Sequence, residues 1–291
     1  MSFLVVGDVI DDILVTPLGA IRNNTDTAAK IISSPGGSAA NFACWLGSLG
    51  ESVNFVGRVG QSDLTRHQAV LQSFGVKPFL QGDNSLGTGS IVVLVEGNNR
   101  SFLTDRGANA NLDVNSIPAS LFGKLLYISG YSLLSLSLVD VQNLIARAHA
   151  LGSKVACDPG SAGFIQDFGV KKFLDALSGV DILLPNLEEG RLLSGEDWPE
   201  VITAFLAERF ETVALTMGAA GCAVQRGESY LQLPAPKADV LDPTGAGDAF
   251  GAAFLKELLV SDNLDKAAKA AIRQGAIAVT VSGGRPEKSS Q

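Results

Sequence analysis

Short apolar runs alternate with longer segments of helical period along most of the chain. Residues 3–7, 52–56 and 125–129 are rich in branched apolar side chains, which predicts strands. Segments 38–49 and 138–151 carry apolar residues at helical spacing, which predicts helices between the strands. Alternation of strands and helices is typical of βαβ units that build a parallel sheet.

Three later strands have the same character. Residues 154–158, 181–184 and 212–216 are apolar along their length, as expected of strands covered on both faces. We therefore predict an α/β protein with a doubly wound, mainly parallel sheet flanked by helices. No linker separates two units, so we expect a single domain over residues 1–291.

Two segments, about 12–34 and 86–106, interrupt the alternation because they contain strand patterns with no helix between them. Within the second, residues 91–95 and 100–104 flank the turn Gly97-Asn98-Asn99 and predict a hairpin. Such inserts predict a small β-sheet lid over the crevice at the carboxyl ends of the parallel strands. Exposed edges of lid strands also allow a homodimer through the lid.

Composition narrows the class of protein. The 291 residues are 46% hydrophobic and 18% charged, which indicates a folded globular chain rather than a disordered one. A net charge of −8, with 22 scattered basic residues, argues against nucleic acid as a partner. Three widely spaced cysteines in apolar surroundings indicate a reducing compartment, so we expect a cytoplasmic location. No apolar stretch is long enough for a membrane segment.

The segment 242–251 offers a site for an anion. Gly245 and Gly247 free the backbone to turn its N–H groups toward one point, and the helix that follows adds a partial positive charge. Asp248 falls where this helix begins, and a lone Asp there is usually an N-cap. Beside a phosphate cradle, however, a carboxylate is placed to take a proton from an attacking hydroxyl, and this combination favours a catalytic role.

Two other segments have weaker signals. Gly36 and Gly37 open a helix as in an ordinary strand-to-helix turn, but the amide of Asn41 in that apolar helix needs a partner. Asn186 and Glu189 follow a buried strand and lie three residues apart, which fits a capped helix start. In a crevice, the same pair could order the waters around Mg²⁺.

Several enzyme classes are excluded by missing motifs. The chain has no GxxxxGK[ST] loop and no complete GxGxxG, so a P-loop is absent and a Rossmann cofactor site is disfavoured. It has no HExxH, CxxC or GxSxG, which makes a zinc enzyme, a thiol enzyme or a serine hydrolase of the elbow type improbable.

Taken in order, these segments resemble the PfkB or ribokinase-like carbohydrate kinases over nearly the whole chain. The stretch 242–248 is similar to the C-terminal signature of the family, and Gly36-Gly37 with Asn41 is similar to its N-terminal glycine motif. The resemblance implies that Asp248 is the catalytic base. It also implies that the N–H groups of Gly245, Ala246 and Gly247 form the anion hole for the γ-phosphate.

The resemblance assigns the acceptor site as well. The residues expected at the substrate are Asp12, Gly36, Gly37, Asn41 and Arg106. Asp11 is an adjacent alternative to Asp12, because the sequence does not fix the register. Arg106 ends the predicted lid, and a salt-bridged surface arginine is the alternative to a substrate contact.

On the nucleotide side, the resemblance places Asn186 and Glu189 near Mg²⁺ and the phosphates, with Glu189 acting through water. Thr216 and Gly218 match the family's nucleotide-contacting Thr-x-Gly. A monovalent cation, K⁺, would be held by carbonyls of Asp242 and Thr244 and by the loop 278–284.

These observations lead to an expected function. We expect an ATP-dependent kinase that phosphorylates a primary hydroxyl of a neutral sugar, as ribokinases and fructokinases do. A nucleoside kinase is the alternative, with Phe102 or Tyr131 stacking on a base. A phosphosugar kinase ranks third, because only Arg106 and Arg22 offer positive charge near the acceptor. A non-catalytic nucleotide- or sugar-binding sensor is the rival from another class.

Overall fold

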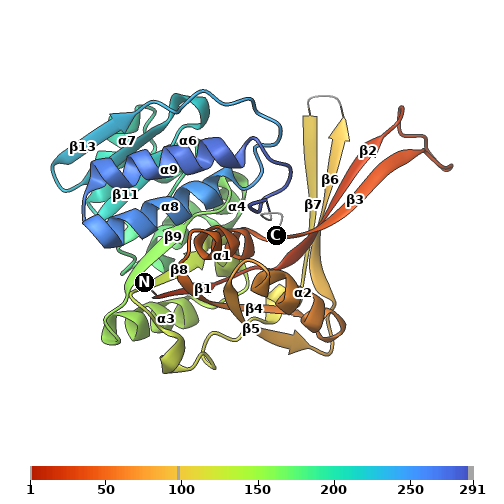
Figure 1. Ribbon diagram of the computed structural model, residues 1–291, viewed down its shortest axis with the longest axis horizontal. Helices are drawn as coiled ribbons and strands as arrows, with labels where there is room; N and C mark the ends of the chain where they lie inside the picture. Colours follow the sequence, from red (N-terminus) through yellow and green to blue (C-terminus); the bar gives the residue numbers. More distant parts are fainter. Residues whose placement is uncertain (1, 97–98, 288–291) are drawn as a thin grey trace.

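The computed structural model describes residues 2–96 and 99–287 and contains two β-sheets of different size (Figure 1). The large sheet has the strand order β13-β12-β11-β10-β9-β8-β1-β4-β5. The small sheet has the order β3-β2-β6-β7. A mainly parallel α/β sheet with a smaller lid sheet is therefore confirmed.

Seven neighbouring strands of the large sheet run parallel, and two antiparallel strands complete one edge. The parallel strands are β1 (Ser2–Val6), β4 (Ser52–Gly60), β5 (Val76–Asp83), β8 (Leu125–Ser129), β9 (Lys154–Asp158), β10 (Ile182–Leu183) and β11 (Thr212–Thr216). The antiparallel strands are β12 (Cys222–Arg226) and β13 (Ser229–Leu233).

Helices cover both faces of the large sheet. One face carries α1 (Ser38–Ser48), α2 (Leu64–Gln72), α8 (Ala246–Ser261) and α9 (Leu264–Ala278). The other carries α3 (Leu138–Ala150), α4 (Ala162–Phe168), α5 (Val170–Ala176), α6 (Leu187–Ser194) and α7 (Pro199–Ala207). Short 3-10 turns occupy 61–63, 108–111, 119–121, 130–134 and 218–220.

The central strand β1 explains why its sequence is apolar at consecutive positions. Phe3 and Val5 pack into the core under α1 and α8, whereas Leu4 and Val6 pack into the core on the opposite face. Successive side chains of a strand point to opposite faces, so a strand buried on both faces needs apolar residues throughout.

Strand β1 pairs with β4 on one side and with β8 on the other. The chain adds β4 and β5 on one side of β1 and then β8 to β11 on the other, so the strand order reverses at β1. The loops that follow these strands therefore diverge and leave a crevice at their carboxyl ends. The loop after β1 leads directly into the small sheet, so the crevice and the lid are neighbours in the chain as well as in space.

The small sheet stands to one side of the large one (Figure 1). It consists of β2 (Ile10–Pro17), β3 (Ala29–Gly36), β6 (Thr88–Glu96) and β7 (Asn99–Gly107). The predicted hairpin corresponds to the antiparallel pair β6 and β7, with Gly97 and Asn98 outside the described residues. The first insert begins two residues earlier than predicted, because Ile10 already pairs with Gly36 and Gly89. None of the described helices is long and apolar enough to span a membrane.

Candidate functional site

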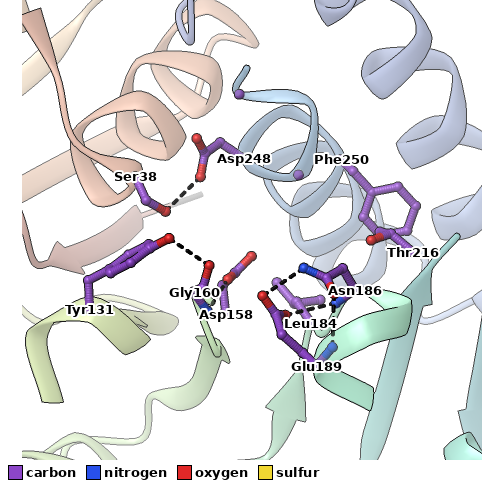
Figure 2. Close-up of a pocket in the computed structure, with 12 residues that line it drawn as sticks. Ser38, Tyr131, Asp158, Gly160, Leu184, Asn186, Glu189, Thr216, Asp248 and Phe250 are labelled. Carbon is purple, nitrogen blue, oxygen red and sulfur yellow. Dashed lines mark hydrogen bonds between the residues drawn. The ribbon is translucent and has the colours of Figure 1, made fainter. Parts of the chain in front are cut away.

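A pocket of about 200 Å³ lies at the carboxyl ends of the parallel strands. It collects residues from segments that are far apart in the sequence (Figure 2). Its lining comprises Ser38, Tyr131, Asp158, Gly160, Leu184, Asn186, Glu189, Thr216, Gly245, Gly247, Asp248 and Phe250. Seven of the residues singled out in the sequence thus share one cavity, namely Tyr131, Asn186, Glu189, Thr216, Gly245, Gly247 and Asp248.

Asp248 is not the N-cap that a lone Asp at a helix start suggests. Helix α8 begins at Ala246, and its N-cap is Gly245, which provides no side chain for capping. Asp248 is the third residue of the helix, and its Oδ1 accepts a hydrogen bond of 2.8 Å from the Ser38 hydroxyl. Figure 2 shows the carboxylate turned toward Ser38, across the top of the pocket. The carboxylate is therefore oriented by Ser38 of the neighbouring helix α1 and does not cap its own helix.

The surroundings of Asp248 strengthen it as a base. Burial raises its pKa well above the ordinary value, and the nearby Asp158 carboxylate raises the pKa further. Hydrogen bonds from Ser38 and Asn41 act in the opposite direction. A carboxylate with a raised pKa accepts a proton more readily than an exposed one, as general-base catalysis requires.

The start of α8 needs glycine at Gly245. Its φ of 77° lies in the left-handed region, and a Cβ there would overlap the carbonyl oxygen of Gly284. The first turn of a helix leaves N–H groups without helical acceptors. Ala246 N–H turns back to the Pro243 carbonyl at 3.3 Å, whereas Gly247 lines the pocket with open space above its Cα. Of the predicted anion hole, Gly247 is the member most accessible from the pocket.

The Asp242 side chain fixes the loop that precedes α8. Its Oδ1 accepts hydrogen bonds from the backbone N–H and the hydroxyl of Thr244, at 3.1 and 2.7 Å. Its Oδ2 accepts a hydrogen bond of 3.0 Å from the N–H of Gly283. The two segments expected to supply carbonyls to K⁺ are therefore joined to each other, while the carboxylate itself is used to hold the loop.

Asn186 and Glu189 form a complete capping box at the start of α6. The Glu189 N–H donates to Asn186 Oδ1 at 2.9 Å, and the Asn186 N–H donates to Glu189 Oε2 at 2.9 Å. Asn186 Nδ2 also donates to Glu189 Oε1 at 2.7 Å. The capped helix start is therefore confirmed, and both side chains also line the pocket. Burial, aided by Asp158, raises the pKa of Glu189 to about 8.

Asp158 is a pocket residue that the sequence analysis did not select. It ends β9, and its Oδ1 accepts a hydrogen bond of 2.8 Å from the N–H of Gly160. Tyr131 donates its hydroxyl to the Gly160 carbonyl at 2.7 Å. Burial raises the pKa of Asp158 to about 7. Its position at the carboxyl end of a buried strand was the available signal, because strand ends in parallel sheets meet at the crevice.

The start of α1 is held by a second residue that the analysis did not select. Gly37 has a φ of 97°, and a Cβ there would lie 2.5 Å from the Asp8 carbonyl oxygen. The Asp8 carboxylate accepts hydrogen bonds from the N–H groups of Ser38 and Ala39, at 2.8 and 3.2 Å. Asp8 therefore caps α1 from the β1–β2 loop and places Ser38 opposite Asp248.

Asp11 and Asp12 have different surroundings. Asp11 forms a two-pronged ion pair with Arg66, at 2.8 and 2.6 Å. Asp12 lies against Gly36, where an added Cβ would overlap its carboxylate. Burial raises the pKa of Asp12 to about 6, against the lowering effect of Arg285. The position of Asp12 beside the glycine pair favours it over Asp11 as the substrate contact.

Asn41 finds its partner in Arg285, a third residue that the analysis did not select. The Arg285 Nε donates to Asn41 Oδ1 at 3.0 Å, and its Nη2 donates to the Gly36 carbonyl at 3.0 Å. Asn41 is buried, so its amide depends on these contacts, and it also lowers the pKa of the nearby Asp248 carboxyl. No local sequence signal connects position 285 with positions 36 and 41.

Arg106 is not an exposed salt-bridged arginine. It is half-buried, and its Nη1 donates to the Tyr131 carbonyl at 2.8 Å, while the guanidinium lies 5.3 Å from the centre of the Phe164 ring. Thr216 ends β11 and lines the pocket. Gly218, with a φ of 56°, begins the 3-10 turn that follows and lies outside the pocket lining.

Within the described residues, no group of three or more His, Cys, Asp and Glu side chains is arranged to hold a metal ion. This donor chemistry does not suit a metal caged by protein alone. It suits Mg²⁺ that keeps waters and phosphate oxygens, because each Glu189 oxygen accepts one hydrogen bond and retains a lone pair for a water.

Comparisons with known proteins agree with this geometry. The family model described as pfkB family carbohydrate kinase matches residues 2–290. A fructokinase of Escherichia coli is 28% identical and covers 96% of this chain and 93% of its own. An ATP-dependent ribose-1-phosphate kinase of Halopiger xanaduensis is 30% identical and covers 87% and 82%. The crystal structure of adenosine kinase from Sinorhizobium meliloti superposes with a TM-score of 0.87 at 23% identity, covering 98% and 95%, which shows a shared fold.

Proposed function

The chain belongs to the pfkB family of carbohydrate kinases, and we propose that this ATP-dependent kinase transfers the γ-phosphate to a primary hydroxyl of a neutral sugar. Its relatives include kinases of sugars, of a sugar phosphate and of a nucleoside, so family membership leaves the acceptor open.

One observation carries the proposal. The Asp248 carboxylate is buried in the first turn of α8, beside the backbone that opens at Gly245 and Gly247. A base and an anion cradle are thus adjacent, as phosphoryl transfer to a hydroxyl requires. A protein that only bound sugar or nucleotide would have no need of a base there.

In the proposed reaction, the oxygen of the acceptor hydroxyl attacks the γ-phosphorus. At the same time, an Asp248 carboxylate oxygen accepts the proton of that hydroxyl. The bond from the γ-phosphorus to the bridging oxygen breaks, and ADP leaves with the electron pair of that bond. Ser38 keeps the carboxylate oriented through its 2.8 Å hydrogen bond. The N–H groups of Gly245, Ala246 and Gly247 stabilise the charge on the transferring phosphoryl group, for which Ala246 exchanges its long hydrogen bond to the Pro243 carbonyl.

The nucleotide side is assigned to the opposite wall of the pocket. Asn186, Thr216 and Gly218 would contact the nucleotide, and Glu189 would hold Mg²⁺ through water. When bound, Mg²⁺ neutralises charge on the phosphate oxygens. The capping box holds Asn186 and Glu189 rigidly, so that α6 presents both side chains to the pocket.

The acceptor side is assigned to residues near the lid. Those proposed to bind the acceptor are Asp12, Gly36, Gly37, Asn41 and Arg106. Their connection to the base is supported by Asn41, which lies close enough to Asp248 to lower the pKa of its carboxyl. Arg106 is braced by Tyr131 and Phe164, so it would contact the acceptor from a fixed position.

A K⁺ ion bound by carbonyls of Asp242, Thr244 and the loop 278–284 is part of the proposal. It is supported by the hydrogen bond that joins Asp242 to Gly283. Replacing K⁺ by tetramethylammonium should lower kcat with little change in protein stability. Equal rates in the two salts would contradict a cation at this loop.

A nucleoside is the second candidate acceptor, because the fold is shared with an adenosine kinase and Tyr131 lines the pocket. The Tyr131 ring already lies against Gly160, about 3.0 Å from where a Cβ would stand. Phe102 is 63% exposed on the lid, and it would have to move to reach a base. We therefore rank a sugar first.

A homodimer through the lid is proposed from its exposed apolar residues. Ile31, Phe102 and Leu103 are each more than 60% exposed on β3 and β7. Light scattering of the purified protein distinguishes a dimer from a monomer. A dimer that Phe102→Ser dissociates would support the lid contact, and a monodisperse monomer would reject it.

The function is tested by an ATP-consumption screen with Mg²⁺ and K⁺ over pentoses, hexoses, nucleosides and sugar phosphates. Mass spectrometry of the product should show one added phosphate on a neutral sugar. A nucleoside product would establish the second candidate. ATP binding without turnover on any acceptor would favour a sensor.

A further inference from the structure

One side-chain nitrogen of Arg285, Nη1, lacks a hydrogen-bond acceptor among the described residues. The side chain reaches from the segment after α9 to the end of β3 and the first turn of α1, where Nε and Nη2 donate to Asn41 and Gly36. Its Nη1 is buried, and no hydrogen-bond partner for it exists within the described residues. Buried donors of a charged group are costly when left unpaired, so this atom indicates a missing acceptor.

A hydrogen-bond acceptor for the same ligand, the Asp12 carboxylate, lies close to Arg285. Its carboxylate lies against Gly36, whose carbonyl accepts from Arg285, so the two charged side chains approach the same glycine. The charge of Arg285 favours the ionised form of Asp12 against the effect of burial. The pair thus presents hydrogen-bond donors and acceptors beside each other.

We propose that Arg285 is an acceptor-recognition residue, which binds neighbouring hydroxyl groups of an uncharged polyol together with Asp12. The inference rests on the proposed kinase function and names the substrate class of that site. Each hydroxyl is both a donor and an acceptor, so one donating to Asp12 and its neighbour accepting from Arg285 would satisfy both groups.

The charge balance disfavours a phosphorylated acceptor. Arg285 is the one cation that lowers the pKa of Asp12 among the described residues, whereas the charges of Asp8, Asp11 and Asp242 raise it. Arg66 is engaged in its two-pronged ion pair with Asp11, and the guanidinium of Arg106, the other cation assigned to the acceptor side, donates to the Tyr131 carbonyl. A phosphate placed at Arg285 would face this group of carboxylates, whereas a neutral hydroxyl would not be repelled.

The backbone before Arg285 is anchored to the loop that forms the phosphate cradle. Gly283 N–H donates to Asp242 Oδ2, and Trp45 Nε1 donates to the Gly284 carbonyl at 3.0 Å. Gly284 also packs against Gly245. This anchoring fixes the position of Arg285 relative to Asp248. Because the anchors are backbone groups, we expect loss of the guanidinium to affect acceptor binding more than ATP binding.

The test compares Arg285→Gln and Arg285→Lys with the wild type, using initial rates on the best neutral acceptor from the screen. We expect Arg285→Gln to raise the acceptor KM by about 10- to 100-fold, the range for a hydrogen bond to a charged group, with a smaller fall in kcat. The KM for ATP should change by less than about threefold, since the phosphate contacts remain. Arg285→Lys, which keeps the charge without the planar fork, should lie between.

Arg226→Gln is the matched control. Arg226 is also a half-buried arginine that joins distant segments, through Thr212 and Asp262, but at the far edge of the large sheet. It should leave the acceptor KM unchanged. Arg285→Lys carries the test if Arg285→Gln does not fold.

Two kinetic results would overturn the inference. One is an unchanged acceptor KM in a folded Arg285→Gln protein, and the other is a wild type that prefers a sugar phosphate to its parent sugar. Absence of all turnover by the wild type would reject the proposed function instead. Calorimetric titration with the sugars of the panel would then decide, with weaker binding by Arg285→Gln supporting the inference and equal or undetectable binding overturning it.

Discussion

Helices α1 and α8 begin in nearly the same way, but their first turns face different partners. Each follows a glycine with positive φ, Gly37 at 97° and Gly245 at 77°, and neither glycine has a side chain to cap the helix. At α1, the Asp8 carboxylate accepts the N–H groups of Ser38 and Ala39. At α8 the first turn borders the pocket instead. The α1 opening already holds an anionic side chain, so in the proposed function only the α8 opening is left for an external anion.

The largest effect is expected from Asp248→Asn, which keeps the shape of the α8 opening and removes the base. We expect kcat to fall by about 10³-fold or more, in line with the loss of general-base catalysis. ATP affinity should change little, because the N–H groups of the helix remain. Steady-state rates and calorimetric ATP titration measure the two effects. Unchanged turnover would assign the proton to another group.

The two glycines of the α8 opening should respond in opposite ways to alanine. Gly247→Ala adds a methyl group where the space is open to the pocket, so we expect kcat/KM for ATP to fall about 10- to 100-fold. Its stability should stay equal or rise by up to about 1 kcal/mol, since alanine favours helices.

Gly245→Ala should instead reduce the free energy of unfolding by about 1–3 kcal/mol, because of its positive φ and its contact with Gly284. Urea unfolding and rate measurements on both variants compare the positions. Equal losses of stability would contradict the distinction between an open and a packed glycine.

At α1, Asp8→Asn should cost stability first and activity second. Loss of the charged cap is expected to lower the free energy of unfolding by about 1 kcal/mol. Because Ser38 then loses its anchor beside Asp248, kcat should also fall, by about tenfold or less.

Asn263→Ala removes a cap from α9, where the Asn263 side chain accepts from Lys266, and serves as the control. It should lose similar stability with no change in kcat. If Asp8→Asn behaved in the same way, the α1 cap would have no part in placing Ser38.

The last prediction concerns the pH dependence of stability that arises from the Glu189 carboxyl. Its pKa rises from 4.5 in the unfolded chain to about 8 in the folded protein, so the folded state holds a proton that the unfolded state has released between these values. Stability should therefore decrease as pH rises from about 4.5 to about 8. Glu189→Gln should flatten this decrease, and thermal unfolding at pH 5.5 and 8 measures it. A variant as pH-sensitive as the wild type would place the titration at Asp158 or Asp248.

The fold was predictable because it rests on local patterns. Strands such as β1 are apolar at four consecutive positions, and that pattern indicates a parallel sheet without tertiary information. Asp8 and Asp158 also lay within reach of the same reasoning, since each sits at or just after the end of a buried strand. They lacked a motif to draw attention to them.

Other features of the site depend on tertiary contacts and could not be derived. The choice between Asp11 and Asp12 depends on which lid face turns inward, and strand alternation says only that the two point apart. The capping interpretation of Asp248 was wrong because Gly245 takes the cap position. Arg285 was missed because its partners Gly36 and Asn41 lie more than 240 positions earlier.

The hydrogen bond between Arg285 and Asn41 also has a consequence for the order of folding. It joins residues 244 positions apart, whereas the strand pairs and the α6 capping box form over much shorter loops. Contacts that close long loops form late, since their entropic cost is met before they contribute. A folding intermediate would thus possess the large sheet and the α6 capping box before its acceptor loop is braced. Newly folding molecules should acquire ATP affinity earlier than sugar affinity.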